Sequence, residues 1–284
     1  MGSHIMIRLN VFLQRSRMKN LSRRDVLGPL GIAAGSCMLS SCLSGNETPA
    51  ADQAKASDRP WTYHELDPDI TAARAYDDHA KGHCMYGVFS SVITQLSEEY
   101  GEPYRSFPVG MMHYGGGGTG SSGSLCGALN GSAALIGLFV QEEEEMKQLV
   151  AEMFLWYEQT LLPTYSPATP GLDVEIPKSI SNSILCHASA TFWCKVAGHK
   201  TSSKPRKERC RRLTADTARK TVHILNSYHH DRFAPLHQST EEVKECQSCH
   251  TKGSEKENSK GTMSCGSCHF SPTDTHPPID ETSG

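Results

Sequence analysis

The chain has 284 residues, enough for about two domains, and a formal net charge of −3, with 37% of its residues hydrophobic. A charge so near zero gives no electrostatic case for binding nucleic acid or an acidic membrane surface, and no apolar run approaches the roughly 18 residues of a membrane-spanning helix. The excess of 11 Cys and 14 His points instead to disulfides, metal or a covalent cofactor.

Residues 1–60 are predicted to be an export signal and a linker. The sequence SRRDVL (22–27) resembles the twin-arginine signal, and the mildly apolar stretch after it suits the hydrophobic region of such a signal. The sequence LSSC (39–42) resembles a lipobox, in which Cys42 would carry a lipid anchor. Simple cleavage near Ala50 is the alternative. Either way, we expect a periplasmic protein.

The middle of the chain has the apolar periodicity of an all-α domain. The stretch 125–140 is apolar on every side and is predicted to be a buried central helix. Four glutamates at 142–145 lie where a helix N-terminus favours negative charge. No segment has a convincing strand pattern. The expected helices span about 67–80, 85–100, 125–140, 142–157, 181–197 and 206–228.

A glycine-rich segment, HYGGGGTGSSGS (113–124), precedes the central helix. It lacks the Lys-Ser/Thr ending of a phosphate-binding loop and follows no predicted strand, so a nucleotide site is disfavoured. It is either a flexible connection or a place where the backbone approaches a cofactor closely, for which glycine leaves room.

Two C-x-x-C-H motifs follow near the C-terminus. In such a motif the two thiols attach a c-type haem covalently, and the histidine is placed to bind the iron. The cysteine spacing also fits a zinc ribbon, but a ribbon has no use for a histidine after each second cysteine, and covalent haem is attached outside the cytoplasm. We therefore expect two haems, at Cys246, Cys249 and His250, and at Cys265, Cys268 and His269.

A second histidine on each haem iron would give a low-spin centre suited to electron transfer. The candidates that flank the motifs are His276, His229 and His230, and His79 with His83, one helical turn apart, are the next pair. The two motif histidines are 19 residues apart (269 − 250), so one short segment cannot bury both porphyrins. We expect a homodimer to cover them.

Five further cysteines follow the leader: Cys84, Cys126, Cys186, Cys194 and Cys210. In an exported protein they form either two disulfides with one spare thiol, or the ligands of an iron–sulfur cluster, which needs four. A cluster is normally built in the cytoplasm, so its protein must cross the membrane folded. The twin-arginine route allows that.

The sequence CGALNG (126–131) is the C-G-A-x-x-G motif of a small family of redox proteins. Together with the paired C-x-x-C-H motifs, it resembles the split-Soret cytochrome c family from about residue 63 to 276. The resemblance implies a dimeric dihaem cytochrome with an iron–sulfur site, here a two-iron two-sulfur cluster, and haems grouped at one end of the dimer. The redox proteins share four cysteines, whose order is matched by Cys84, Cys126, Cys194 and Cys210, with Cys186 able to replace Cys194.

These features predict an exported electron-transfer protein rather than an enzyme. A helical redox domain (61–228) would be followed by a dihaem segment (229–284), and the protein would relay electrons between partner redox proteins. A small-molecule reductase is the alternative, and it would need an open haem or cluster site. A zinc-stapled binding module is the remaining possibility.

Overall fold

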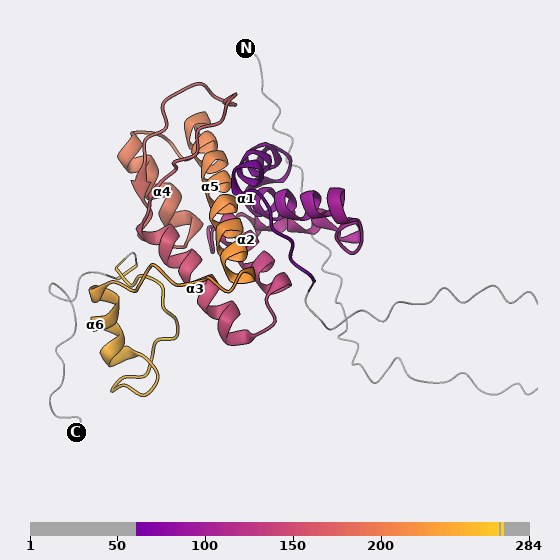
Figure 1. The fold of residues 1–284 in the computed structure, drawn as a ribbon. Helices are drawn as coiled ribbons and strands as arrows, with labels where there is room; N and C mark the ends of the chain where they lie inside the picture. The colour runs from indigo at the N-terminus through magenta and orange to yellow at the C-terminus, as the bar shows by residue number, and fades with distance from the viewer. Residues whose placement is uncertain (1–60, 267, 270–284) are drawn as a thin grey trace, which may run out of the picture. The chain divides into compact units, whose positions relative to one another are not determined.

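The computed structural model describes residues 61–266, 268 and 269. Helices dominate this part of the chain, which confirms the all-α prediction (Figure 1). None of its helices is both long and apolar enough to cross a membrane. The α-helices are α1 (Pro68–Tyr100), α2 (Gly127–Phe139), α3 (Glu143–Gln159), α4 (Cys186–Ala197), α5 (Lys204–His229) and α6 (Glu241–His250), and the short 3-10 segments are η1 (Tyr104–Ser106), η2 (Val109–Gly115) and η3 (Thr119–Ser121).

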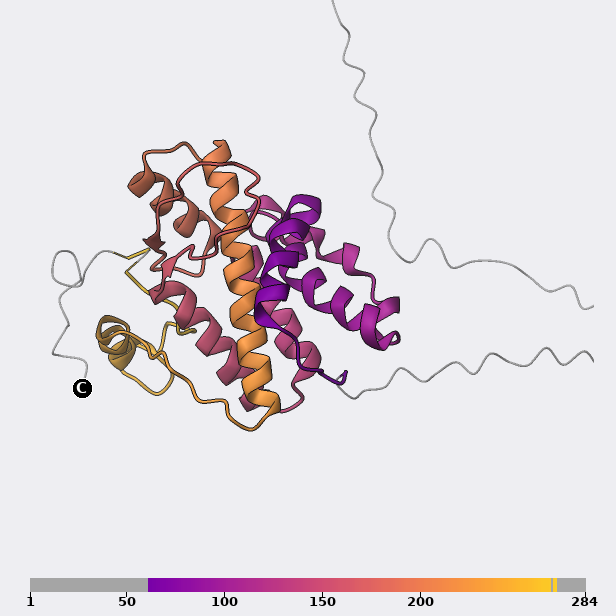
Figure 2. The ribbon, with the colours of Figure 1, turned by 45° about the horizontal axis from the view of Figure 1, so that its top comes forward.

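The core lies where α1, α2 and α5 meet. The long helix α5 runs along α1, and α2 packs against both (Figures 1 and 2). Val88, Leu129 and Val222, one from each helix, have no exposed surface. Burial of such side chains is the main force that holds helices together. The central position predicted for the apolar stretch 125–140 is therefore confirmed.

A kink interrupts α1 at Gly82 and His83, whose backbone angles are not helical. The two helices expected here are thus joined end to end instead of being separated by a loop. The predicted start is confirmed, because the Asp67 side chain accepts hydrogen bonds from the N–H groups of Asp69 and Ile70. His83 has a φ of +67°, a strained value for a residue with a side chain. Cys84 comes directly after this strained residue.

The glycine-rich segment folds tightly on itself through η2 and η3. Gly118 has a φ of +81°, and a Cβ at this position would lie 2.6 Å from the backbone nitrogen of Ser124. Close packing within the loop therefore accounts for the glycine at this position.

Three sequence predictions were wrong in detail. Strands β1 (Leu161–Leu162) and β2 (Ser179–Ile180) pair antiparallel, although no strand was expected. Beyond β2 the N–H of Asn182 donates to the carbonyl oxygen of Glu158, and Leu185 forms a bridge with Leu125, so α4 begins at Cys186 instead of 181. In addition, the C-terminal part contains helix α6, which starts at an N-cap where the Thr240 side chain accepts from the N–H of Val243.

The C-terminal segment, defined here as residues 230–269 without 267, is attached to α3 by polar contacts. The carboxylate of Glu152 accepts hydrogen bonds from the backbone N–H groups of Leu236 and His237, both at 3.0 Å, and from Lys220 Nζ at 2.7 Å. Within this segment Val243 is the one apolar side chain that is fully buried. The segment therefore has almost no apolar core of its own.

Candidate functional site

Five cysteines of the helical domain come from four different regions of the fold. Cys84 follows the kink of α1, Cys126 precedes α2, Cys186 and Cys194 lie on α4, and Cys210 lies on α5. Cys126, Cys194 and Cys210 are buried, and the other two are half-buried. No cysteine in the described part of the chain is in a disulfide.

Cys84 and Cys210 interact where α1 packs on α5. Their mutual interaction raises the pKa of Cys84 well above the usual thiol value and lowers the pKa of Cys210 well below it. Guanidinium nitrogens of Arg206 and Arg209 lie 3.8 and 4.0 Å from Cys210 Sγ and also favour its thiolate. His79 Nε2 is 3.6 Å from Cys84 Sγ, and burial lowers the pKa of His79 to about 4. A thiolate, a thiol and a neutral imidazole, all potential metal ligands, therefore lie together.

Cys126 and Cys186 approach the same place from α2 and α4. The Tyr157 hydroxyl donates to Cys126 Sγ over 3.3 Å and lies 2.9 Å from Ser189 Oγ. Burial raises the pKa of the Cys126 thiol. Burial, followed by the charges of Cys126 and Cys210, raises the pKa of Cys186 to about 12. We call Cys84, Cys126, Cys186 and Cys210 the cysteine site.

Cys194 lies in a different environment. It packs in a small apolar cluster with Ile176 and Trp193. Burial raises the pKa of its thiol. The charges of Arg206, Cys210 and Arg209 also act on Cys194, so it adjoins the cysteine site at Cys210, whereas Cys186 is influenced by both Cys126 and Cys210. The ligand assignment itself remains a prediction.

Gly127 lets the start of α2 approach α1 beside two of these thiols. A Cβ at this position would lie 2.1 Å from the carbonyl oxygen of Gly115 and 3.2 Å from Cys84 Cβ. The first distance is far below any van der Waals contact, so only glycine fits. The first glycine of the C-G-A-x-x-G motif, Gly127, thus has a packing role directly at the cysteine site.

The donor set suits a sulfur-bound centre better than a hard cation. Within the described residues no three His, Cys, Asp or Glu side chains converge closely enough to hold a single metal ion. Arg209 is 2% exposed, and its buried Nε has no hydrogen-bond partner, although its terminal nitrogen donates to Ser189 Oγ at 2.8 Å. A buried donor without an acceptor, next to a thiolate, fits an anionic group that brings acceptors of its own.

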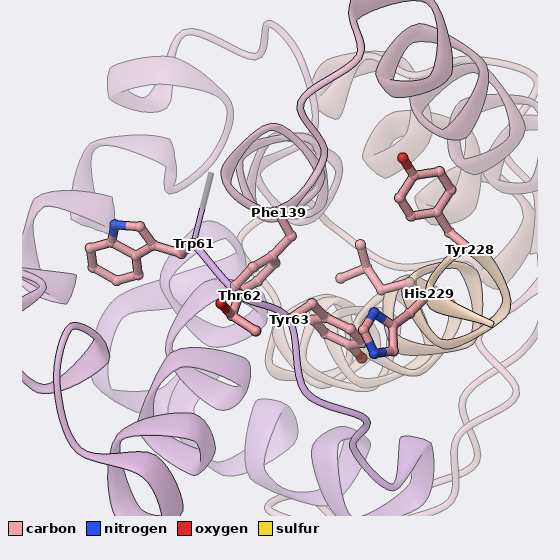
Figure 3. A pocket seen from close by; sticks show the side chains of 7 residues that line it. Trp61, Thr62, Tyr63, Phe139, Tyr228 and His229 are labelled. Atoms are coloured by element: carbon pink, nitrogen blue, oxygen red, sulfur yellow. The ribbon is translucent and has the colours of Figure 1, made fainter. Parts of the chain in front are cut away.

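The candidate distal histidines occupy different places. His79 and His83, with ring centroids 6.1 Å apart, adjoin the cysteine site through Cys84. His229 lines a cavity of about 250 Å³ at the end of α5, where its ring packs edge-on against Tyr63 (Figure 3). His230 lies 2.9 Å from a Glu65 oxygen. His276 lies outside the described residues.

The two C-x-x-C-H motifs lie close to each other in the C-terminal segment. Cys246, Cys249 and His250 occupy the end of α6. The N–H groups of Cys268 and His269 both donate to the carbonyl oxygen of Cys265, which closes a tight turn at the second motif. Burial raises the pKa of the Cys265 thiol, and the nearby Cys246 raises it further. The thiols of the two motifs therefore approach one another.

Consecutive residues of α3 contact both regions. Tyr157 donates to Cys126 in the cysteine site, and the next residue, Glu158, accepts a hydrogen bond from the N–H of Ser264 at 3.3 Å. Ser264 directly precedes the haem-motif residue Cys265. The end of α3 therefore lies between the cysteine site and the second motif.

Sequence analysis missed these contacting residues. Tyr157 falls within the helix expected at 142–157 without any mark of a contact role, and nothing in the local sequence distinguishes Glu158. Arg206 and Arg209 carried a usable signal, because cations four residues and one residue before a cysteine lower its pKa when they lie on a helix with it.

The family described as "Putative redox-active protein (C_GCAxxG_C_C)" matches residues 86–224. Its printed pattern has glycine before cysteine, whereas this chain reads Cys126-Gly127 at that point. The chain is 40% identical over 267 residues to the split-Soret cytochrome c of Desulfovibrio desulfuricans, covering 88% of this chain and 95% of the relative. A solved structure, described as a novel iron centre in that cytochrome, matches with a TM-score of 0.71 and 39% identity over 76% of this chain and 95% of the other.

Proposed function

The chain belongs to the split-Soret cytochrome c family of electron-transfer cytochromes, and on that premise we propose that it relays electrons between two haems and an iron–sulfur centre. The observation that carries the proposal is the pair of adjacent C-x-x-C-H motifs, connected through the end of α3 to a site of four thiols.

The haems would be held by the C-terminal segment. Two thiols of each motif would form the covalent links, and His250 and His269 would bind the irons. Covalently bound porphyrins would supply the apolar bulk that this segment lacks, since Val243 is its one fully buried apolar side chain within the described residues. Bound haem supplies one-electron chemistry at iron. The chain's own part is to hold the two motifs side by side and against α3.

The cysteine site would hold a two-iron two-sulfur cluster. Cys84, Cys126 and Cys210 belong to both ligand sets considered, and the packing favours Cys186 over Cys194 as the fourth. Arg206 and Arg209 would balance the negative charge of the thiolates, and the unpartnered Nε of Arg209 would find an acceptor there. Tyr157 would donate to a ligand sulfur and so stabilise its charge.

Axial ligation, assembly and location complete the proposal. We propose that both haems have histidine on each face, with His276, His229 or His230 as distal ligands, and that a homodimer covers the porphyrins. Export by the twin-arginine route to the periplasm, with or without a lipid anchor at Cys42, fits a protein that must fold around a cluster before it crosses the membrane.

The test is cofactor analysis of anaerobically prepared full-length protein. Mass spectrometry of the denatured chain should find two covalent haems, and iron and sulfide assays should find two further irons and two sulfides per chain. Zinc without haem would overturn the proposal. Two haems without sulfide, with disulfides among the five cysteines, would remove the cluster. Carbon monoxide binding to the reduced wild type would favour a reductase with an open haem.

Matched cysteine variants distinguish the two ligand sets. We expect Cys186→Ala to lose the acid-labile sulfide and Cys194→Ala to keep it, because Cys186 interacts with Cys84, Cys126 and Cys210, whereas Cys194 interacts with Cys210 and packs against Trp193. The opposite result would support the set matched by family order, Cys84, Cys126, Cys194 and Cys210.

A further inference from the structure

A short turn joins the end of α4 to the start of α5 (Figure 2), and the exposed residues around it are basic and partly apolar. On α4, Phe192 and Val196 are one turn apart and share a face with Lys195, and they are 40% and 53% exposed. Lysines of the following turn and of the start of α5 continue the surface. We call it the basic corner, and it consists of Phe192, Lys195, Val196, Lys200, Lys204 and Lys207, all exposed.

The positive charge of the basic corner is not balanced locally. Ion pairs occur elsewhere among the described residues, but none of them includes one of its four lysines. The first turn of α5 has no acidic residue, whereas the first turn of α3 has three. A cation near a helix N-terminus opposes the helix dipole. This placement therefore costs stability, as is typical of functional surfaces.

The start of α5 carries two lysines of the basic corner and also an arginine that contacts the cysteine site. Arg206 lies in the first turn of α5 between Lys204 and Lys207, and its guanidinium nitrogen is 3.8 Å from Cys210 Sγ. Lys204 and Lys207 also line an open cleft of about 310 Å³ whose floor includes the buried, ion-paired Glu208. A protein docked here would thus stand at the same end of α5 as Cys210, a thiol of the cysteine site.

We propose that the basic corner is the docking surface for a small acidic redox protein, which delivers electrons one at a time to the cysteine site. This inference rests on the proposed function. Two exposed apolar side chains rimmed by cations match the usual pattern of an apolar interface centre with a polar rim. Unpaired lysines attract an acidic partner and speed its association at low salt. In each transfer the partner's iron loses one electron and an iron of the cysteine site gains one.

The experiment is stopped-flow electron transfer to the full-length holoprotein from a reduced plant-type ferredoxin, an acidic iron–sulfur protein, at several ionic strengths. We expect Lys204→Glu/Lys207→Glu to lower the second-order rate constant about tenfold or more at low salt. The effect should vanish near 0.5 M salt, because the Debye length then falls to a few ångströms. A basic class I cytochrome c serves as the opposite-charge probe and should gain rate from the same variant.

The matched control is Arg105→Glu/Arg232→Glu, which changes the net charge equally at two exposed cations without an ion pair among the described residues. It should change the rate less than twofold. Equal effects of the two variants would overturn the docking proposal, and so would a wild-type rate with no salt dependence or no ferredoxin reaction at low salt.

A change of oligomeric state in Lys204→Glu/Lys207→Glu would assign the surface to a second copy instead. Haem and sulfide contents are measured on the same samples, so loss of the proposed function itself would be visible separately.

Discussion

The helical domain (61–229) and the C-terminal segment (230–269) are held together by different forces. In the helical domain, α1, α2 and α5 bury whole apolar faces against one another. In the C-terminal segment, the fully buried apolar side chain is Val243, and hydrogen bonds to Glu152 and Glu158 attach the described chain to α3. The comparison teaches that the first region can fold by its sequence alone, whereas the second needs something bound to it.

The largest expected effect is the loss of structure in the C-terminal segment without haem. In a variant with Cys246, Cys249, Cys265 and Cys268 all changed to Ala, amide exchange of residues 241–269 should approach the rate of unfolded peptide. Residues 68–229 should keep their protection, because their core is independent of haem. Hydrogen exchange read by mass spectrometry is the measurement, with Cys194→Ala as control. Retained protection of α6 would contradict the comparison.

A second prediction concerns the apolar core of the helical domain. Leu129→Ala should lower the free energy of unfolding by about 2–5 kcal/mol, because Leu129 is fully buried in α2 and its loss leaves a cavity. The same substitution at Leu236, which is 79% exposed in the C-terminal segment, should change it by less than about 0.5 kcal/mol. Denaturant titration of both variants provides the comparison. Similar changes in the free energy of unfolding for the two variants would contradict the view that the two regions differ in apolar burial.

The attachment between the regions should depend on the Glu152 carboxylate. Glu152→Gln should lower the free energy of unfolding by about 1–3 kcal/mol. The substitution removes the buried charged acceptor to which Lys220 and the backbone N–H groups of residues 236 and 237 donate. Limited proteolysis should then cut between 231 and 240. Glu143→Gln, at an exposed ion pair with Lys147, is the control and should have little effect.

The pH dependence of this attachment follows from the same carboxylate. Burial opposes its charge, but the hydrogen bonds from Lys220 and His237 outweigh burial and hold the pKa of Glu152 below its ordinary 4.5. A carboxylate with a lowered pKa stabilises the fold above its ordinary value, and the contribution is lost as the pH falls through the lower pKa. The stability difference between wild type and Glu152→Gln should therefore be full at pH 7 and vanish in acid. A difference that persists in strong acid would contradict this.

The smallest expected effect concerns the electrostatics of the cysteine site. Arg209 is a buried cation beside Cys210, so it would favour the reduced, more negative state of a cluster held there. Arg209→Gln should lower the reduction potential of that centre by on the order of 50 mV. Arg105→Gln, at an exposed position, should shift it far less. Potentiometric titration monitored by electron paramagnetic resonance distinguishes the two. An unchanged reduction potential in Arg209→Gln would mean that Arg209 has a structural role only and that its charge does not influence the centre.

Much of the helical domain could be predicted because its helices carry local signals. The acidic cap at Asp67, the apolar stretch of α2 and the glutamates at the start of α3 each identify a helix from neighbouring residues alone. The start of α4 was wrong because the bridge between Leu125 and Leu185, directly before this helix, joins residues far apart in the chain. Helix α6 was missed although Thr240 with Glu241 and Glu242 is a usable N-cap signal.

What the sequence by itself determined is the chemistry whose residues are adjacent in the chain. Each C-x-x-C-H motif spans five residues, so its spacing alone predicts how thiols and imidazole meet a porphyrin. The cysteine site is different, because its four thiols come from three long helices and the start of α2. Only the packing of α1, α2, α4 and α5 decided that Cys186 interacts with Cys84, Cys126 and Cys210, while Cys194 packs with Ile176 and Trp193 and adjoins the site at Cys210. Contacts between distant residues depend on side-chain volume and helix packing over the whole core, which no local pattern records.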